Sequence, residues 1–252
     1  MTEAQLIKDL LYRLADDKLI IGHRNSEWCG MGPVLEEDIA FASMAQDELG
    51  HAWSYYRILE ELGEGHPDQV AFNRTPKEFT SCHLVEYPIG DYAFSLMRHF
   101  LFDYADRIRL KYLQQCDYTP LRDLSAKIAR EEKYHQLHGK TWVTQLAKGT
   151  EEARLRMQTA LNEAYPMAFG MFEPGEHDQA ISNAGLMPEE EEVCEEWQTA
   201  IEPVLVNAGL QIPENPEIAP HLGGRKGYHS EHLAPLLSEM TEVFQIDPTA
   251  QW

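Results

Sequence analysis

The chain has 252 residues, of which 43% are hydrophobic, and a formal net charge of −21 at pH 7. This length and apolar content suffice for a large core, while so acidic a chain repels phosphate backbones and anionic lipids, so we expect neither nucleic-acid nor membrane binding. No stretch approaches the roughly 18 uninterrupted apolar residues of a membrane span, and no basic segment followed by an apolar run indicates a signal peptide.

The predicted elements are almost entirely helices. The stretch 64–87, interrupted by Pro67 and Pro76, is expected to cross the bundle between long helices at about 34–62 and 88–115. Thr119-Pro120 is typical of a helix start. Apolar periodicity near 3.6 residues predicts four long helices, over about 3–27, 34–62, 88–115 and 119–148.

The pattern is less regular after the fourth long helix. Thr150 is expected to cap a shorter helix that ends near Pro166, and 169–175 is expected to be a loop. Ser230 is expected to cap a last helix over about 231–245. The other expected segments are short helices at 176–184 and 189–208, and an extended segment at 212–227.

Two of the long helices carry the same pair of residues on the face that should be buried. At about 100° per residue, Glu48 lies within the apolar stripe of the second helix and Glu132 within that of the fourth. A histidine follows each glutamate three residues later, His51 and His135. A buried carboxylate is costly unless it is neutralised, so the two pairs predict one shared polar centre.

The other two long helices also place a charge on their inward faces. The apolar stripe of the third helix contains Asp103, and that of the first contains Lys18. A bundle of this kind is typical of ferritin-like carboxylate proteins, in which Glu-x-x-His pairs hold two metal ions. We therefore expect an all-α, ferritin-like four-helix bundle with a crossover connection and additional C-terminal helices. All of 1–252 is expected to be one domain, with a core at about 3–165 and an extension at about 166–252.

Carboxylates and imidazoles on neighbouring positions of one helix face can reach the same metal ion. Such a carboxylate-rich set suits iron or manganese. The sixth ligand position is occupied by Lys18. The candidate metal ligands are Glu48, His51, Asp103, Glu132 and His135.

Lys18 leaves three interpretations open, because a metal site would place an acid at its position. One is a functional metal pair with an unusual lysine beside it. Another is a single metal ion held by a subset of the candidate ligands. The last is a metal-free relic in which the lysine ammonium pairs with the carboxylates and replaces the metal charge.

Other polar residues near these helix faces are expected to have structural roles. Glu131 lies at the edge of its stripe and is expected to be a surface residue or a secondary partner. His99 is expected to be a hydrogen-bonded residue beside the stripe, and His138 is expected on the outer side of its helix. Arg107 lies one turn after Asp103 and is expected to pair with a buried acid.

The glycine-rich string from Gly223 to Gly227 contains the one concentrated basic spot, Arg225-Lys226. A phosphate or a partner's acidic group is one expected ligand for it, and a glycine-rich connector is the alternative. His229 and His232 are expected to pack at the start of the last helix. The four cysteines (Cys29, Cys82, Cys116 and Cys194) show no Cys-x-x-Cys spacing. The cysteines therefore indicate neither zinc nor a disulfide framework, and we expect a cytoplasmic protein.

Several strings resemble the PaaC-type subunit of the bacterial phenylacetyl-CoA epoxidase complex. The resemblance covers essentially the whole chain, and its most specific part is C-terminal. The strings are Glu27-Trp28-Cys29-Gly30, Leu35-Glu36-Glu37-Asp38, Leu84-Val85-Glu86-Tyr87-Pro88 with Gly90-Asp91, Tyr134-His135, Gly223-Gly224-Arg225-Lys226-Gly227 with His229, Glu231-His232-Leu233, and Gln251-Trp252.

The resemblance implies a ferritin-like bundle and a structural role beside a PaaA-type catalytic subunit, which carries the di-iron site. That catalytic subunit uses oxygen and electrons from a reductase to epoxidise the ring of phenylacetyl-CoA. The chain would then belong to an oxidoreductase complex without being catalytic alone, contacting the reductase only indirectly and forming a homodimer in isolation.

This chain departs from the family pattern, in which PaaC-type subunits have lost much of the metal shell. Glu48, His51, Asp103, Glu132 and His135 resemble the ligands of the PaaA-type chain, and Lys18 stands where that chain has a glutamate. A partial or vestigial di-iron site is therefore one expectation. Besides a structural role, the alternatives are a metal-dependent oxygenase or oxidase that uses these ligands, and a ferritin-like metal store.

Overall fold

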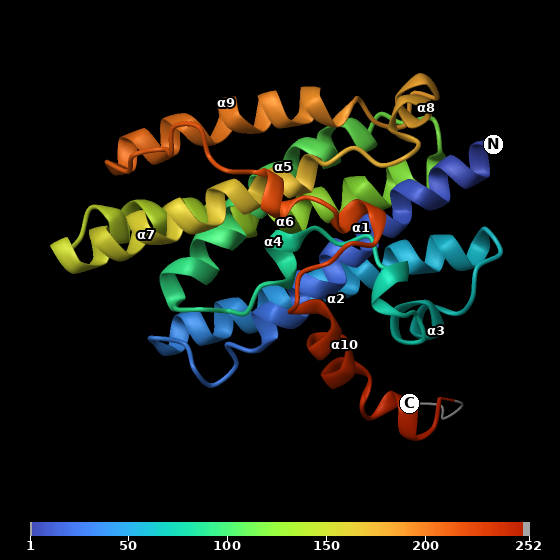
Figure 1. Cartoon of the computed structure of the whole chain (residues 1–252), viewed down its shortest axis with the longest axis horizontal. Helices are drawn as coiled ribbons and strands as arrows, with labels where there is room; N and C mark the ends of the chain where they lie inside the picture. Colours follow the sequence, from blue (N-terminus) through green and yellow to red (C-terminus); the bar gives the residue numbers. More distant parts are fainter. Residues whose placement is uncertain (1, 249–252) are drawn as a thin grey trace.

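The computed structural model describes residues 2–248, which form helices and no strands. Gln251 and Trp252, which contribute to the family resemblance, lie outside the described residues. The helices form an elongated bundle (Figure 1), which confirms the prediction of an all-α, ferritin-like fold. Its four long core helices are α1 (Glu3–Ser26), α2 (Leu35–Glu61), α5 (Tyr92–Leu113) and α6 (Thr119–Ala147).

The core helices associate as two hairpins. Helix α1 packs along α2, α5 packs along α6, and α2 meets α6 where the two hairpins face one another. The connection between the hairpins contains the short helices α3 (Pro67–Phe72), η1 (Pro76–Glu78) and α4 (His83–Glu86). It is the expected crossover, and it brings α4 against α1.

Helix boundaries follow local capping. Helix α5 begins at Tyr92, later than expected from Pro88, because the Asp91 side chain accepts a hydrogen bond from Phe94 N at 2.9 Å. Thr150 caps α7 (Glu151–Ala168) as expected. This helix continues past Pro166 and then tightens into the 3₁₀ segment η2 (Phe169–Phe172).

The C-terminal third adds helices to both sides of the bundle. Helix α9 (Glu190–Ala208) lies along α5 and α6, whereas α10 (Leu233–Thr241) contacts the crossover, and Figure 1 shows them on opposite sides of the molecule. The last helix is shorter than expected. Ser230 lies before it, with His232 as its N-cap, because Ser230 donates its N–H and hydroxyl to Glu86 instead. The remaining short helices are α8 (Asp178–Asn183), η3 (Ala219–His221), η4 (Gly224–Lys226) and η5 (Phe244–Ile246).

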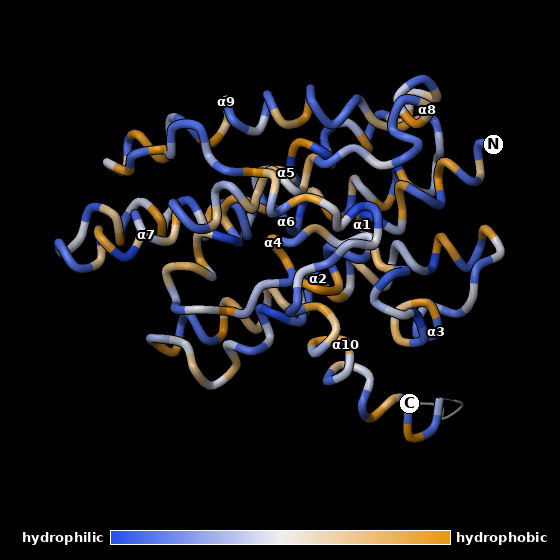
Figure 2. Tube along the Cα trace, in the orientation of Figure 1, coloured by the Kyte–Doolittle hydropathy of each residue, from blue (hydrophilic) through white to orange (hydrophobic). Residues whose placement is uncertain are grey.

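Apolar residues line the inner faces of the helices. Figure 2 shows hydrophobic and hydrophilic positions interspersed along the helices. The indole of Trp197 on α9 is fully buried and stacks on Tyr165, which joins α9 to α7. Between residues 2 and 248, no helix is both long and apolar enough to cross a bilayer. The assignment of the chain to one domain, with a separate C-terminal extension, stays a prediction.

Candidate metal centre and its buried lysine

The inward charges of the four core helices meet in the middle of the bundle. The Lys18 side chain is only 2% exposed, and its Nζ lies 2.7 Å from Glu48 Oε2 and 2.6 Å from Glu132 Oε1. A third carboxylate, that of Asp106, places Oδ2 2.8 Å from the same nitrogen. One ammonium group from α1 therefore contacts carboxylates from α2, α5 and α6.

Asp106 is the site residue that the sequence analysis missed. Asp103, the acid that it named on α5, instead pairs with His99, whose Nδ1 lies 2.6 Å from Asp103 Oδ1. Both aspartates are at most 4% exposed. Since Asp106 lies three residues after Asp103, it shares the inward face of the helix, and following that face for one more turn identifies it.

Each histidine of the Glu-x-x-His pairs is held from outside by a partly exposed carboxylate. His51 Nε2 lies 2.7 Å from Glu131 Oε2, and His135 Nε2 lies 3.2 Å from Asp47 Oδ2. The other ring nitrogen of His51 faces Glu132 at 3.5 Å, and that of His135 faces the same residue at 3.4 Å. Glu131 is thus the secondary partner that we expected. Such outer carboxylates orient imidazole rings and raise their basicity.

The charges of the side chains in this cluster shift one another's pKa values and so set which of them are ionised. Burial lowers the pKa of Lys18, but the carboxylates of Asp106, Glu132 and Glu48 outweigh burial and raise the pKa well above its ordinary value. Burial raises the pKa of Glu48 and Glu132, yet Lys18 holds the pKa of both below the usual range. At Asp106 burial prevails over Lys18 and raises the pKa to about 6. Lys18 is therefore a permanent cation between ionised glutamates.

Two groups of buried side chains in the described part of the chain bring their ligand atoms within 4.8 Å of one another and could hold a metal ion. One group is Glu48, His51 and Glu132, and the other is Glu48, His99, Asp103 and His135.

The first group does not fit a metal ion while Lys18 keeps this position. The ammonium lies within 2.7 Å of Glu48 Oε2 and Glu132 Oε1, and a metal ion would approach the same oxygens to roughly 2 Å. Two cations would then be in contact, and the raised pKa leaves the lysine nitrogen without a lone pair to offer. The residues present therefore do not fit a two-metal centre.

In the second group Glu48 contacts Lys18 through Oε2, whereas its other oxygen, Oε1, lies 3.6 Å from His135 Nδ1 within the group. Asp103 Oδ2 and His99 Nε2 are buried and have no hydrogen-bond partner among residues 2–248. Those free atoms fit a single ion better than they fit a closed salt-bridge network. The expectation that His99 is only a hydrogen-bonded residue beside the stripe is too limited, since His99 lies within this group.

Two other expectations about polar residues are wrong. His138 is buried rather than outward-facing, because Glu37 on α2 also turns inward and places Oε2 2.8 Å from His138 Nε2. Arg107 pairs with no buried acid in the part of the chain that the structure describes. It donates to the side-chain oxygen of Gln136 at 2.8 Å, because the acid one turn away, Asp103, is directed into the core.

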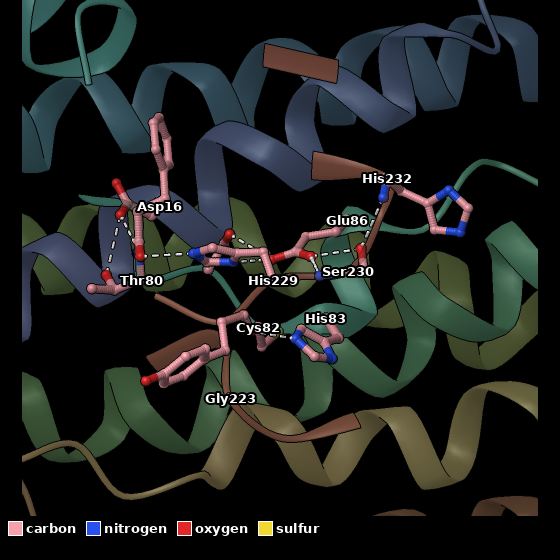
Figure 3. A network of polar contacts seen from close by, with 12 residues as sticks. Asp16, Thr80, Cys82, His83, Glu86, Gly223, His229, Ser230 and His232 are labelled. Carbon is pink, nitrogen blue, oxygen red and sulfur yellow. Dashed lines mark hydrogen bonds and ion pairs between the residues drawn. The ribbon is translucent and has the colours of Figure 1, made fainter. Parts of the chain in front are cut away.

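The segment around Arg225 is a structural connector, and Arg225 is not a free anion site. The Arg225 guanidinium is buried and donates to both Asp17 carboxylate oxygens, at 3.0 and 2.7 Å. Gly224 passes so close to the segment before α4 that a Cβ there would lie 2.2 Å from the Ser81 carbonyl oxygen. Figure 3 shows the polar network beside this segment, in which Glu86 Oε1 lies 2.6 Å from His229 Nδ1.

The stability of the folded chain is predicted to depend on pH, because His51 titrates within the cluster. Burial lowers its pKa, but contacts with Glu132 and Glu48 outweigh this effect and raise the pKa to about 9. Between its unfolded value of about 6.5 and pH 9 the folded chain binds the extra proton, so stability falls as pH rises through this window. Urea unfolding in the presence of a chelator should show the free energy of unfolding about 2–3 kcal/mol lower at pH 9.5 than at pH 6.

The matched variant for this measurement is His51→Asn, which should lose most of the difference between the two pH values. A wild-type free energy of unfolding that is equal at both pH values would show that His51 is not protonated in the folded state.

Comparisons with known proteins fit this arrangement. A family model described as "Phenylacetic acid catabolic protein" matches residues 1–252. The chain belongs to this family. It is 33% identical over 241 residues to the PaaC subunit of 1,2-phenylacetyl-CoA epoxidase from Escherichia coli K12, covering 95% of this chain and 96% of that relative. It is 26% identical over 159 residues to the PaaA subunit of the same enzyme, covering 63% of this chain and 51% of that relative.

Family membership confirms the resemblance seen in the sequence. The match to PaaC runs through nearly the whole of both chains, whereas the match to PaaA covers about half of that relative. The chain is therefore a homologue of PaaC with more distant similarity to PaaA, and the comparisons do not favour an independent oxygenase or oxidase.

Proposed function

We propose that this chain is the structural, non-catalytic subunit of a phenylacetyl-CoA epoxidase that acts in aerobic phenylacetate degradation. It would support a PaaA-type catalytic subunit that carries the di-iron site. The proposal draws on the near full-length similarity to PaaC and on the chemistry of the buried cluster.

The position of Lys18 is the observation that carries this proposal. Its ammonium makes three carboxylate contacts at 2.6–2.8 Å in the centre of the bundle. A buried ion pair is tolerated when the geometry is close and the opposite charges are matched. The lysine neutralises carboxylates that two metal ions would otherwise neutralise, so the bundle can fold and remain rigid without metal.

The second ligand group supports an alternative function, in which the chain binds one iron ion in a partial site. Glu48, His99, Asp103 and His135 would be its ligands. Their mixture of imidazole and carboxylate suits iron or manganese, and an iron ion held there would supply redox chemistry. This alternative remains compatible with a structural role in the complex.

The wider setting follows from the family. We propose a cytoplasmic hetero-oligomer with the PaaA-type subunit, indirect contact with the reductase, and a homodimer when the chain is alone. Rigid helices such as α1 and α2 suit a scaffold, because their packing does not require a bound cofactor.

Reconstitution with a PaaA-type subunit tests this proposal. The two chains should co-purify, and the complex containing His135→Gln in this chain should epoxidise phenylacetyl-CoA within about twofold of wild type, because a residue that holds no catalytic metal is dispensable for turnover. A loss of activity of about 100-fold in a complex that still assembles would assign the chemistry to this chain and contradict the proposal.

A further inference from the structure

A groove of about 710 Å³ lies where α5, α6 and α9 run side by side (Figure 1), on the side of the bundle away from α10. Four cations from two helices line it: Arg107 and Lys111 from α5, and Arg130 and Lys133 from α6. All four side chains are exposed. Its size lies within the range of pockets that hold small organic ligands.

Cationic side chains outnumber acidic ones in this groove, whereas the chain as a whole is strongly acidic. The whole chain has 42 acidic and 21 basic residues, so a cation on its surface should readily find an acidic partner. Lys111 pairs with Glu196, which also lines the groove, and Arg107 helps to lower the pKa of the same glutamate. Among the described residues, however, Lys133 has no ion pair and Arg130 contacts only the Ala126 carbonyl. Two of the four cations therefore have no carboxylate to neutralise them, and the other two share one.

The inner part of the groove is apolar and reaches the buried cluster. Tyr104 and Ile108 form part of its lining, together with the small side chains of Ala126 and Ala129. Glu132, one of the two glutamates that contact Lys18, also lines the groove although it is only 3% exposed. The groove therefore has a cationic rim, an apolar wall, and a floor at the lysine–carboxylate cluster.

We propose that this groove binds a small amphipathic anion with phosphate groups, its phosphates at the cationic rim and its apolar part along the wall. Guanidinium groups bind phosphate through paired hydrogen bonds, and unpaired lysines add charge. An acyl thioester of coenzyme A has this chemistry. Choosing it as the probe rests on the proposed function, because the relatives' names identify such a thioester.

Binding is tested on the full-length chain without a partner, by isothermal titration with phenylacetyl-CoA. The double variant Arg130→Ala/Lys133→Ala should raise the Kd at least tenfold, and added salt should weaken wild-type binding. The matched control, Arg122→Ala/Lys140→Ala, removes two cations from the same helix that do not line the groove, the exposed Lys140 and the half-buried Arg122. It should change the Kd by less than about twofold.

A second variant tests the apolar wall. Ala129→Trp fills the inner part of the groove, so it should weaken phenylacetyl-CoA binding more than binding of inorganic pyrophosphate. Equal effects of the two double variants, or no wild-type binding at millimolar ligand, would overturn the proposal.

A different result would assign the groove to a protein partner and would also overturn the proposal. In that case the chain alone would bind no thioester, while Arg130→Ala/Lys133→Ala would abolish co-purification with the PaaA-type chain. Co-purification of wild-type chains tests the proposed function separately, so failure of one proposal can be distinguished from failure of the other.

Discussion

Replacing Lys18 with methionine is expected to lower the free energy of unfolding by about 3–5 kcal/mol. Methionine fills much of the same volume, but it leaves the carboxylates of Glu48, Asp106 and Glu132 buried without their cation. Uncompensated buried charge is the costly part of a broken internal salt bridge. Chemical denaturation at pH 7.5, with a chelator present, measures the change.

The control for this experiment is Lys8→Met, because Lys8 also makes a 2.7 Å ion pair, with Glu64, but both side chains are at least 24% exposed. It should cost less than about 1 kcal/mol. The loss of free energy of unfolding in Lys18→Met should be smaller at pH 5, where the carboxylates can take up protons. A loss below about 1 kcal/mol at pH 7.5 would show that Lys18 does not neutralise the cluster.

Replacing Lys18 with glutamate is expected to convert the cluster into a metal-binding site. The change removes the only lysine in the cluster and adds a carboxylate to a bundle centre that already contains those of Glu48, Asp106 and Glu132. Divalent cations are then the available means of neutralising the buried charge. Lys18→Glu should bind about one to two iron or manganese ions per chain, measured by elemental analysis after refolding with the metal.

A second readout is the melting temperature. Added Fe²⁺ or Mn²⁺ should raise the melting temperature of Lys18→Glu by several degrees, because a ligand that binds only the folded state stabilises it. Lys8→Glu, with the same charge change near the surface, should bind no additional metal. If Lys18→Glu folds and binds no more metal than wild type, Lys18 is not what keeps metal out of the first ligand group.

Much of the bundle was predictable because it depends on local periodicity. The first two helices begin and end within one residue of their expected positions, and the crossover follows from its prolines. The convergence of Lys18, Glu48 and Glu132 was also predictable. A 100° step per residue places each of them on a buried face, and buried charges of opposite sign attract one another.

The features that sequence reasoning missed depend on tertiary partners. His138 is buried because Glu37 from another helix turns inward to meet it, and no periodicity in α6 contains that information. Ser230 has the side chain of a typical cap, yet it bonds to Glu86, which lies 144 positions away in sequence. The cationic groove needs α5, α6 and α9 together, so single-helix patterns could not indicate it.

Metal analysis of the purified wild-type chain tests the role of Lys18 most directly. The full-length chain is expressed in iron-rich medium, purified without chelator, and measured for iron and manganese per chain. Substitution of metal charge by the Lys18 ammonium predicts no more than about one ion per chain, held by the second ligand group, and about one ion more in Lys18→Glu prepared in parallel. Two ions per wild-type chain would contradict the account, because the lysine and a two-metal centre cannot share the same carboxylate oxygens.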